Sequence, residues 1–262
     1  MAQRQETGHS GKLLNQVALV TGASGGMGSA ICRRLAQAGA RVCVHYHRSQ
    51  CDADALVSEL TNTTRATAFA ADLRDEIQVK VLIEHCIKHF GRLDILVNNA
   101  GWSQLVPAEN LDELSDDVIN QTLALKIHGP LYCVRAARPY LAISGQGNIV
   151  NITSVAGIAA KGSTIIYAAA NAALSNLTRS WARSLAPEIR VNAVAPGFVN
   201  TGLVYPMDGP AAERIAKNNY LGRTITAAEI ADAVYFICAE APGMIGEEIV
   251  IDGGIGRLGL KH

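Results

Sequence analysis

The chain has 262 residues, of which 49% are hydrophobic and 18% charged, a composition typical of globular rather than disordered proteins. Its 23 basic and 23 acidic residues balance, so no net charge favours nucleic acid or an anionic membrane as a partner. The length suits one α/β domain, which we expect over residues 13–262. Residues 1–12 are polar and lack an apolar core, and we expect a flexible tail there rather than a signal peptide.

The distribution of cysteines and apolar residues bears on where the protein works. The six cysteines are scattered and form no Cys-x-x-Cys pair, which predicts buried, reduced thiols. No apolar run approaches the roughly 20 residues that span a bilayer. We therefore expect a cytoplasmic protein with no membrane partner, no nucleic-acid partner and no metal site.

The first predicted element is a strand, residues 17–20, followed by a glycine-rich turn and then a helix over residues 29–38. Glycines let such a turn approach a pyrophosphate, and the helix N-terminus favours its negative charge. Strand, glycine turn and helix together predict a dinucleotide site, whereas an ordinary βα loop is the less favoured alternative. The residues assigned to this contact are Gly22, Ser24, Gly26, Met27 and Gly28.

The second strand, residues 41–46, ends where dinucleotide-binding folds choose between NAD and NADP. A carboxylate at that point would hold the ribose 2′-hydroxyl and repel a 2′-phosphate. The chain instead has Tyr46 followed by His47, Arg48 and Ser49, which offer donors to a phosphate. This favours NADP(H), with NAD(H) still possible, although His47 and Arg48 would equally suit a solvated loop.

Further strands and helices alternate along the chain. Strands are predicted at residues 66–70, 93–97, 148–152, 189–195 and 248–251, and helices at 53–60, 77–90, 115–142, from about 164, and 226–240. This alternation predicts a single Rossmann-like, doubly wound domain with a parallel sheet of about seven strands and helices on both faces. Residues 200–222 are rich in loop-forming residues and are predicted to form a substrate loop or lid.

A candidate proton-transfer site lies at the end of the strand 148–152. Ser154 follows that strand, and Tyr167 and Asn171 are four residues apart on the next predicted helix, so both project from one face. A serine and a tyrosine hydroxyl can share one reacting oxygen. The alternative, an ordinary core pair, is less favoured.

Several of these motifs together resemble the classical short-chain dehydrogenases/reductases over about residues 13–255. The glycine turn has that family's order, Asn98-Asn99-Ala100-Gly101 matches its Asn-Asn-Ala-Gly segment, and Ser154 precedes Tyr167 by the family's thirteen residues. One position departs from the pattern, since Asn171 stands where the family has lysine. Conversely, Lys126 aligns with the position at which relatives carry an asparagine.

The resemblance implies roles for matched residues. The tyrosine would serve as acid/base, the serine would steady the substrate oxygen, and the family's lysine lowers the tyrosine pKa and holds the ribose. It also implies a small carbonyl or alcohol substrate and a homo-oligomer, either a dimer or a tetramer. The further cofactor contacts that it implies are Asp72, Leu73, Asn99, Ala100, Gly101, Pro196, Gly197, Val199 and Thr201.

The exchange of lysine and asparagine leaves three hypotheses open. The favoured one is an NADP(H)-dependent oxidoreductase that uses Tyr167 as acid/base, with Lys126 supplying the cation that Asn171 cannot. The second is a non-redox enzyme on the same scaffold that catalyses a cyclisation, elimination or isomerisation. The third is a catalytically silent dinucleotide-binding subunit. Lys126 would equally suit a solvated helix position without a catalytic role.

Overall fold

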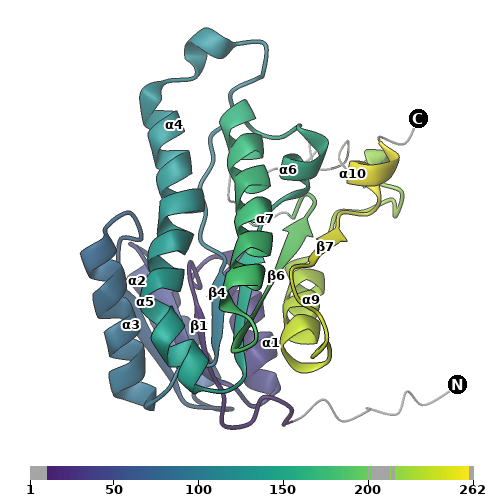
Figure 1. Ribbon diagram of the computed structural model, residues 1–262. Coiled ribbons are helices and arrows are strands. Elements are labelled where there is room, and N and C mark those ends of the chain that lie inside the picture. Colours follow the sequence, from purple (N-terminus) through teal and green to yellow (C-terminus); the bar gives the residue numbers. More distant parts are fainter. Residues whose placement is uncertain (1–10, 200, 202–212, 214–215, 260–262) are drawn as a thin grey trace, which may run out of the picture.

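The protein is a three-layer α/β domain with a central parallel sheet (Figure 1). The computed structural model describes residues 11–199, 201, 213 and 216–259. Its seven strands follow the order β3-β2-β1-β4-β5-β6-β7, and every neighbouring pair is parallel. The predicted doubly wound, seven-stranded fold is confirmed. The strands are β1 (Val17–Val20), β2 (Arg41–Tyr46), β3 (Ala66–Ala70), β4 (Ile95–Asn98), β5 (Gly147–Ile152), β6 (Ile189–Pro196) and β7 (Glu248–Ile251).

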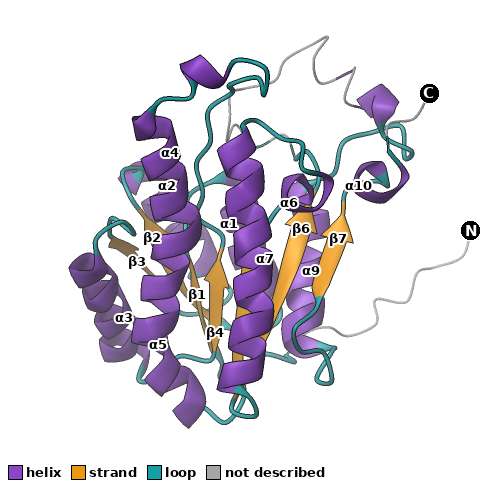
Figure 2. Cartoon of the chain, turned by 45° about the horizontal axis from the view of Figure 1, so that its top comes forward, coloured by secondary structure: helices purple, strands orange, loops and turns teal. Residues whose placement is uncertain are grey.

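Helices cover both faces of this sheet (Figure 2). The larger helices of one face are α1 (Gly26–Gln37), α2 (Gln50–Leu60) and α9 (Ala227–Ala239). Those of the other face are α3 (Glu76–Phe90), α5 (Gly129–Ile143) and α7 (Ile165–Leu185). Shorter elements are α4 (Asp116–Leu123), α6 (Val155–Ala159), α10 (Ile255–Leu258), a 3₁₀ turn (Leu111–Glu113) and a π-helical turn (Ala124–His128).

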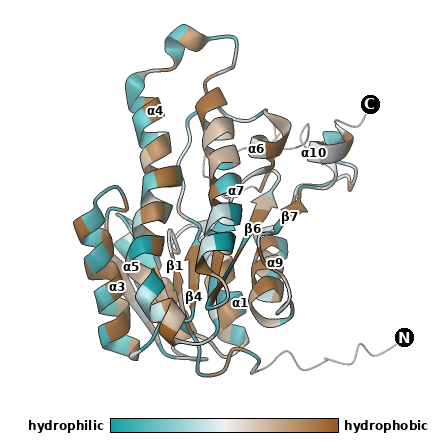
Figure 3. Cartoon of the chain, in the orientation of Figure 1, coloured by the Kyte–Doolittle hydropathy of each residue, from teal (hydrophilic) through white to brown (hydrophobic). Residues whose placement is uncertain are grey.

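The central strands form because their side chains are apolar on both faces. In β1, Ala18 and Val20 enter the core beneath α1, α2 and α9, whereas Val17 and Leu19 enter the core beneath α3 and α5. A strand buried on both faces appears in the sequence as a continuous apolar run, and Figure 3 shows hydrophobic colouring on strands of the sheet. The predicted limits of β1, β2, β3 and β7 are confirmed.

The fourth strand was predicted two residues too early. Residues 93 and 94 precede β4, whose pairing with β1 begins at Ile95 opposite Ala18. The buried carboxylate of Asp94 accepts a hydrogen bond from the main-chain N–H of Val17 at 2.8 Å and is held by Arg92. The main chain of Asp94 is also bonded to Val17 and Asn148, so Asp94 joins the sheet just before the regular strand begins.

The single long helix predicted over residues 115–142 is wrong as one element. The segment consists of α4, the π-helical turn at Ala124–His128 and α5. Pro130 lies just inside α5 and has no N–H to donate to the carbonyl of Lys126, four residues earlier. The regular α-helical ladder is therefore interrupted at Lys126, the residue that the sequence analysis singled out.

Some predictions concern residues that are only partly described. The tail, residues 1–12, is described only at residues 11 and 12. Of the predicted lid, residues 200, 202–212 and 214–215 lie outside the described residues. No helix in the described part of the chain has the length and apolar character needed to cross a membrane. Five of the six cysteines are buried as predicted, whereas Cys51 is exposed.

Candidate active site

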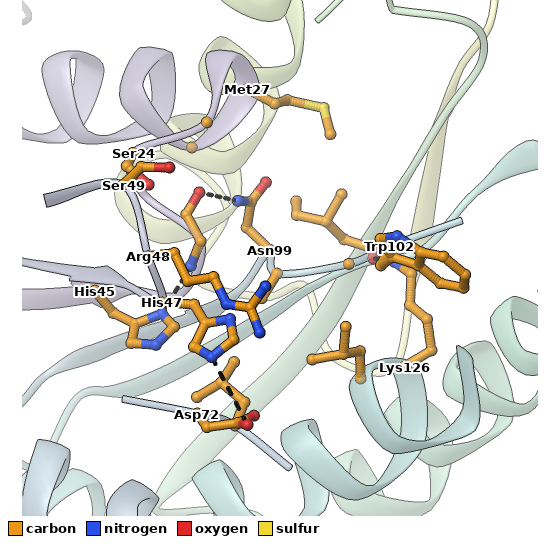
Figure 4. Close-up of a pocket in the computed structure, with 18 of the residues that line it drawn as sticks. Ser24, Met27, His45, His47, Arg48, Ser49, Asp72, Asn99, Trp102 and Lys126 are labelled. Carbon is orange, nitrogen blue, oxygen red and sulfur yellow. Dashed lines mark hydrogen bonds and ion pairs between the residues drawn. The ribbon is translucent and has the colours of Figure 1, made fainter. Parts of the chain in front are cut away.

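A cavity of about 600 Å³ lies at the carboxyl ends of the strands, the edge at which parallel α/β sheets bind their ligands. Figure 4 shows Trp102 and Lys126 at one end of this cavity and His45, His47, Arg48 and Asp72 at the other. The predicted site residues that line it are Gly22, Ser24, Gly26, Met27, Gly28, His47, Arg48, Ser49, Asp72, Leu73, Asn99, Ala100, Gly101, Lys126, Tyr167 and Thr201.

The glycine turn is packed so closely that two of its glycines admit no side chain. A Cβ on Gly28 would lie 2.4 Å from the carbonyl oxygen of Gly22, and one on Gly22 would lie 2.9 Å from the Cα of Ala100. Gly22 also has a φ of +62°, a left-handed conformation that favours glycine. The turn therefore presents bare backbone to the cavity at the start of α1, as a pyrophosphate site requires.

Asn99 connects this turn to the end of β4. Its Nδ2 donates to the carbonyl oxygens of Thr21 at 2.8 Å and Gly22 at 3.1 Å, and its main-chain N–H donates to the Thr21 hydroxyl at 2.9 Å. The Oδ1 atom of Asn99 is buried and has no hydrogen-bond partner among the described atoms. A buried acceptor of this kind is costly unless a ligand or water completes it. It lies on a residue that lines the cavity, which fits a bound dinucleotide.

The opposite end of the cavity is rich in basic groups. His47 and Arg48 are exposed at the end of β2, and Arg74 lines the cavity from the loop after β3. Asp72 is the acid at this end. Arg74 Nη2 contacts its Oδ2 at 2.6 Å, and His47 Nε2 lies 3.7 Å from the same oxygen. Hydrogen bonding from Arg74 lowers the pKa of Asp72 to about 2, so this carboxylate is ionised and largely neutralised by its partner.

The end of β6 is adjacent to the cavity rather than part of its wall. Pro196, Gly197 and Val199 are not among the lining residues, whereas Thr201 is. The N–H of Gly197 donates to the carbonyl oxygen of Ile251 at 2.8 Å, and a Cβ at this glycine would lie 2.7 Å from the Cα of Asp252. These residues therefore fix the course of the chain leading to Thr201.

Tyr167 and Ser154 are positioned by the starts of two helices. The Ser154 hydroxyl caps α6 by accepting from the N–H of Ala156 at 3.1 Å, and Thr164 caps α7 by accepting from the N–H of Tyr167 at 3.0 Å. Burial raises the pKa of Tyr167 above its usual value, an effect that the side chains of Ser154 and Asn171 oppose. The phenol is therefore protonated at neutral pH. Tyr167 lines the cavity, whereas Ser154 does not.

Lys126 lies in the cavity wall within the π-helical turn, and its side chain is 3% exposed. Its Nζ donates to the carbonyl oxygen of Ile152, at the end of β5, at 3.0 Å. The same Nζ is 5.9 Å from the ring centroid of Tyr167. Among the described residues no carboxylate pairs with this ammonium group, and desolvation lowers its pKa to about 8. The structure thus brings a buried amine and the phenol into one cavity.

Asn171 is fully buried on α7, outside the cavity wall. Its Nδ2 donates to the main-chain oxygen of Tyr167 at 2.9 Å, and its Oδ1 has no partner among the described atoms. A Cβ on Gly157 of α6 would lie 2.8 Å from the main-chain carbon of Asn171. The side chain is thus enclosed where α6 meets α7, close to the phenol that it influences.

The sequence and the fold both match known proteins. A family model described as enoyl-(acyl carrier protein) reductase matches residues 22–256. A Streptomyces violaceoruber protein named as ketoacyl reductase 2 of the granaticin polyketide synthase is 37% identical over 91% of this chain and 95% of its own length. The 3-oxoacyl-[acyl-carrier-protein] reductase of Thermotoga maritima is 33% identical over 93% and 99%. A blue fluorescent protein from a metagenomic library, solved with NADPH, superimposes with a TM-score of 0.85 at 34% identity, over 93% and 98%.

The chain is a classical short-chain dehydrogenase/reductase. It therefore belongs to a family of oxidoreductases, which agrees with the predicted enzyme class. The matches extend over nearly the whole chain and nearly the whole of each relative.

Sequence reasoning missed part of this dehydrogenase/reductase site. The further lining residues are Gly25, His45, Ala71, Arg74, Trp102, Gln121, Leu125, Ile152 and Thr153. Arg74 directly follows Leu73, which the sequence analysis assigns to the cofactor, and the positive charge of Arg74 was the signal that would have identified it. The sequence also suggests an apolar pocket lined by Leu105, Val106, Ile158, Ala159, Val204, Tyr205 and Met207. None of the first four lines the cavity, and only Val106 of these four is buried, whereas positions 204, 205 and 207 lie outside the described residues. Within the described part of the chain no cluster of residues suits a metal ion.

The desolvation of Lys126 predicts a distinct dependence of stability on pH. The pKa of Lys126 is lower in the folded protein, about 8, than the ordinary value of 10.5. Its burial therefore opposes folding below pH 8, and the penalty disappears as the pH rises through 10.5. Relative to Lys126→Met, the wild-type free energy of unfolding should rise by about 3 kcal/mol between pH 7 and pH 11. Chemical denaturation at both pH values measures this difference.

The exposed Lys88 of α3 provides the matched control, because Lys88→Met removes an amine that is already in water. We expect its stability difference from the wild type to be the same at both pH values. If the stability difference between Lys126→Met and the wild type were also the same at both pH values, the inference that the Lys126 amine is desolvated would be contradicted.

Proposed function

We propose that the protein is an NADP(H)-dependent oxidoreductase that interconverts a small carbonyl compound and its alcohol, with Tyr167 as the acid/base. The main support is the placement of Lys126, whose ammonium group faces the Tyr167 ring across 5.9 Å in a cavity that begins at a glycine turn. A phenol, a nearby cation and a dinucleotide cradle are the groups that proton-coupled hydride transfer requires.

The cavity fits NADP(H) along its length. The bare turn at Gly22–Gly28 would receive the pyrophosphate, and the unpartnered Oδ1 of Asn99 would accept from a ribose hydroxyl. Arg48 supplies positive charge at the adenosine end, where Arg74 already neutralises Asp72 and His47 offers a ring nitrogen. That balance suits a 2′-phosphate better than a bare hydroxyl. Relatives solved with NADPH and with NADP support the same choice.

In the reducing direction, Tyr167 donates its proton to the carbonyl oxygen of the substrate. The bound nicotinamide supplies the hydride. Because burial raises the pKa of Tyr167, the proton is available for donation at neutral pH. The phenolate that remains is stabilised by the charge of Lys126. Ser154 lies outside the cavity wall, and its hydroxyl would steady the phenol of Tyr167 and through it the substrate oxygen. In the oxidising direction the same groups act in reverse.

Lys126 takes over the charge that family members place at position 171. Asn171 is neutral, and its Nδ2 is bonded to the Tyr167 carbonyl of its own helix. It positions the start of α7 but supplies no charge to a phenolate. Lys126 reaches the cavity from the other side, held by the carbonyl oxygen of Ile152. Its pKa of about 8 leaves it predominantly cationic at pH 7.

The names of relatives suggest where to look for a substrate. Two of those described above are named ketoacyl and 3-oxoacyl reductases, so a panel of ketones should include 3-oxoacyl thioesters. We propose that the protein works as a homo-oligomer, and the partly exposed Phe236 on α9 and Ile245 before β7 support an interface at that edge. With its reduced, mostly buried cysteines, a cytoplasmic location is part of the same proposal.

A reciprocal exchange tests the role of Lys126. Lys126→Asn should lower kcat/KM about 10²–10⁴-fold, as should Tyr167→Phe, because each removes a group that acts in the proton-transfer step. Asn171→Lys alone buries a second like charge near the first and should also be impaired. The double variant Lys126→Asn/Asn171→Lys restores the arrangement of the family and should recover most of the activity.

The measurement is NADPH oxidation with the ketone panel, accompanied by calorimetric NADPH binding for each variant. A Lys126→Asn variant with wild-type turnover, or a double variant no better than the worse single variant, would contradict the exchange. Tight NADPH binding by the wild type with no turnover on any ketone would support the non-redox hypothesis instead.

The proposed cation also predicts an alkaline limit to activity. Ketone reduction should decline as the pH rises through about 8, because Lys126 loses its charge there while Tyr167 remains protonated. Lys126→Arg keeps a positive charge to much higher pH, so the decline should move upward. Profiles of kcat at saturating NADPH measure both. An unchanged alkaline limb in Lys126→Arg would assign it to another group.

Cofactor choice should depend on Arg48. Arg48→Ala should weaken NADPH binding about 10- to 100-fold, the cost of a lost hydrogen bond between charged groups, and leave NADH binding nearly unchanged. Isothermal titration calorimetry measures both dissociation constants. Arg33→Ala is the control, since Arg33 is paired with Glu59 outside the cavity. Equal losses for the two nucleotides would contradict a 2′-phosphate site.

A further inference from the structure

His45 is a buried histidine at the junction of three loops. It lies in β2 and lines the cavity, yet only 2% of it is exposed. Its Nδ1 accepts a hydrogen bond from the N–H of Gly22 at 2.9 Å, and its Nε2 lies 3.0 Å from the carbonyl oxygen of Ala71. The carbonyl can only accept, so the ring proton is on Nε2. Both ring nitrogens are thereby used by main-chain groups of other loops.

These two bonds join the glycine turn to the loop that carries Asp72. Gly22 opens the turn after β1, and Ala71 follows β3 immediately before Asp72. The main chain strengthens the junction, because the N–H of Ala23 donates to the carbonyl oxygen of His45 at 2.8 Å. Gly22 cannot move toward β4, since it packs on Ala100. The imidazole therefore sets the separation between the glycine turn and the loop that carries Asp72 and Arg74.

The bond to Gly22 exists only while the imidazole is neutral. Burial is the main cause that lowers the pKa of His45 to about 4; the Ala71 carbonyl and Asp72 oppose this shift, and His47 adds to it. Arg48 and Arg74 line the same cavity and also disfavour a second positive charge. At neutral pH, Nδ1 thus holds a lone pair for the Gly22 N–H.

We propose that His45 is a positioning residue for the dinucleotide, one that holds the pyrophosphate turn and the adenosine loop at the separation that NADP(H) spans. The inference rests on the proposed function, because it concerns the affinity for the same cofactor. His45 acts through Gly22 and Ala71 and takes no part in proton or hydride transfer. Its loss should weaken cofactor binding while turnover at saturating cofactor is retained.

Three substitutions separate the two bonds. His45→Asn keeps an acceptor near Nδ1 for the Gly22 N–H, His45→Gln keeps a donor near Nε2 for the Ala71 oxygen, and His45→Leu removes both. We expect His45→Leu to raise the Kd for NADPH about 10- to 100-fold, as two lost hydrogen bonds would. His45→Asn and His45→Gln should each restore part of the affinity. The KM for NADPH should follow Kd, whereas kcat should stay within about two-fold.

His85→Leu is the matched control. His85 is a half-buried histidine beside the hydroxyl of Thr67, outside the cavity wall, and its loss should leave the Kd for NADPH unchanged. Circular dichroism verifies that each variant is folded, and His45→Asn provides the test if His45→Leu does not fold.

Two outcomes would overturn the positioning role of His45 and leave the proposed function intact. One is a wild type that binds NADPH together with a His45→Leu variant that binds it equally well. The other is a fall in kcat as large as the rise in KM, with no rescue by either amide. A wild type that binds neither nucleotide would overturn the proposed function as well, so the two failures are distinguishable.

Discussion

The burial of one ammonium group, with no carboxylate partner in the described part of the chain, is the main electrostatic constraint on this cavity. The Nζ of Lys126 donates a hydrogen bond to the main-chain oxygen of Ile152, and desolvation lowers the pKa of Lys126 to about 8. A paired lysine would keep a higher pKa, and its field would be cancelled by the partner. An unpaired charge is not cancelled in this way. Tyr167 shares the cavity with Lys126, and burial raises the pKa of Tyr167.

Features of the surrounding backbone explain how the cavity accommodates a lysine at position 126. The helix widens into a π-helical turn just before Pro130, which cannot donate to the carbonyl of Lys126. A Cβ at Gly101 would lie 3.1 Å from Cε and 3.4 Å from Nζ of Lys126, so the glycine leaves room for the long side chain. The proposed exchange of lysine and asparagine thus depends on backbone features at two further positions of the chain.

The sequence predicts those features that depend on local composition. The strands β1 and β2 have the predicted limits because residues such as Leu19 and Val44 are buried in runs that are apolar on both faces. The glycine turn and Tyr167 can also be recognised in the sequence, because the motifs that contain them have a fixed spacing along the chain. His45 is not, because its partners Gly22 and Ala71 are brought to it only by the order of the strands. Trp102, likewise, enters the cavity only through folding.

The two ends of the cavity differ in the number of charged groups and in the depth of burial. Near Arg48, charge is abundant and solvent is close, so Asp72 is held ionised by Arg74, and a phosphate would meet remaining positive charge. Near Tyr167 burial is deep, so desolvation lowers the pKa of Lys126 and raises that of Tyr167. His45 lies at the Arg48 end as a neutral group whose ring nitrogens bond to the main chain. A neutral imidazole there connects the glycine turn to the loop that carries Asp72 without adding charge.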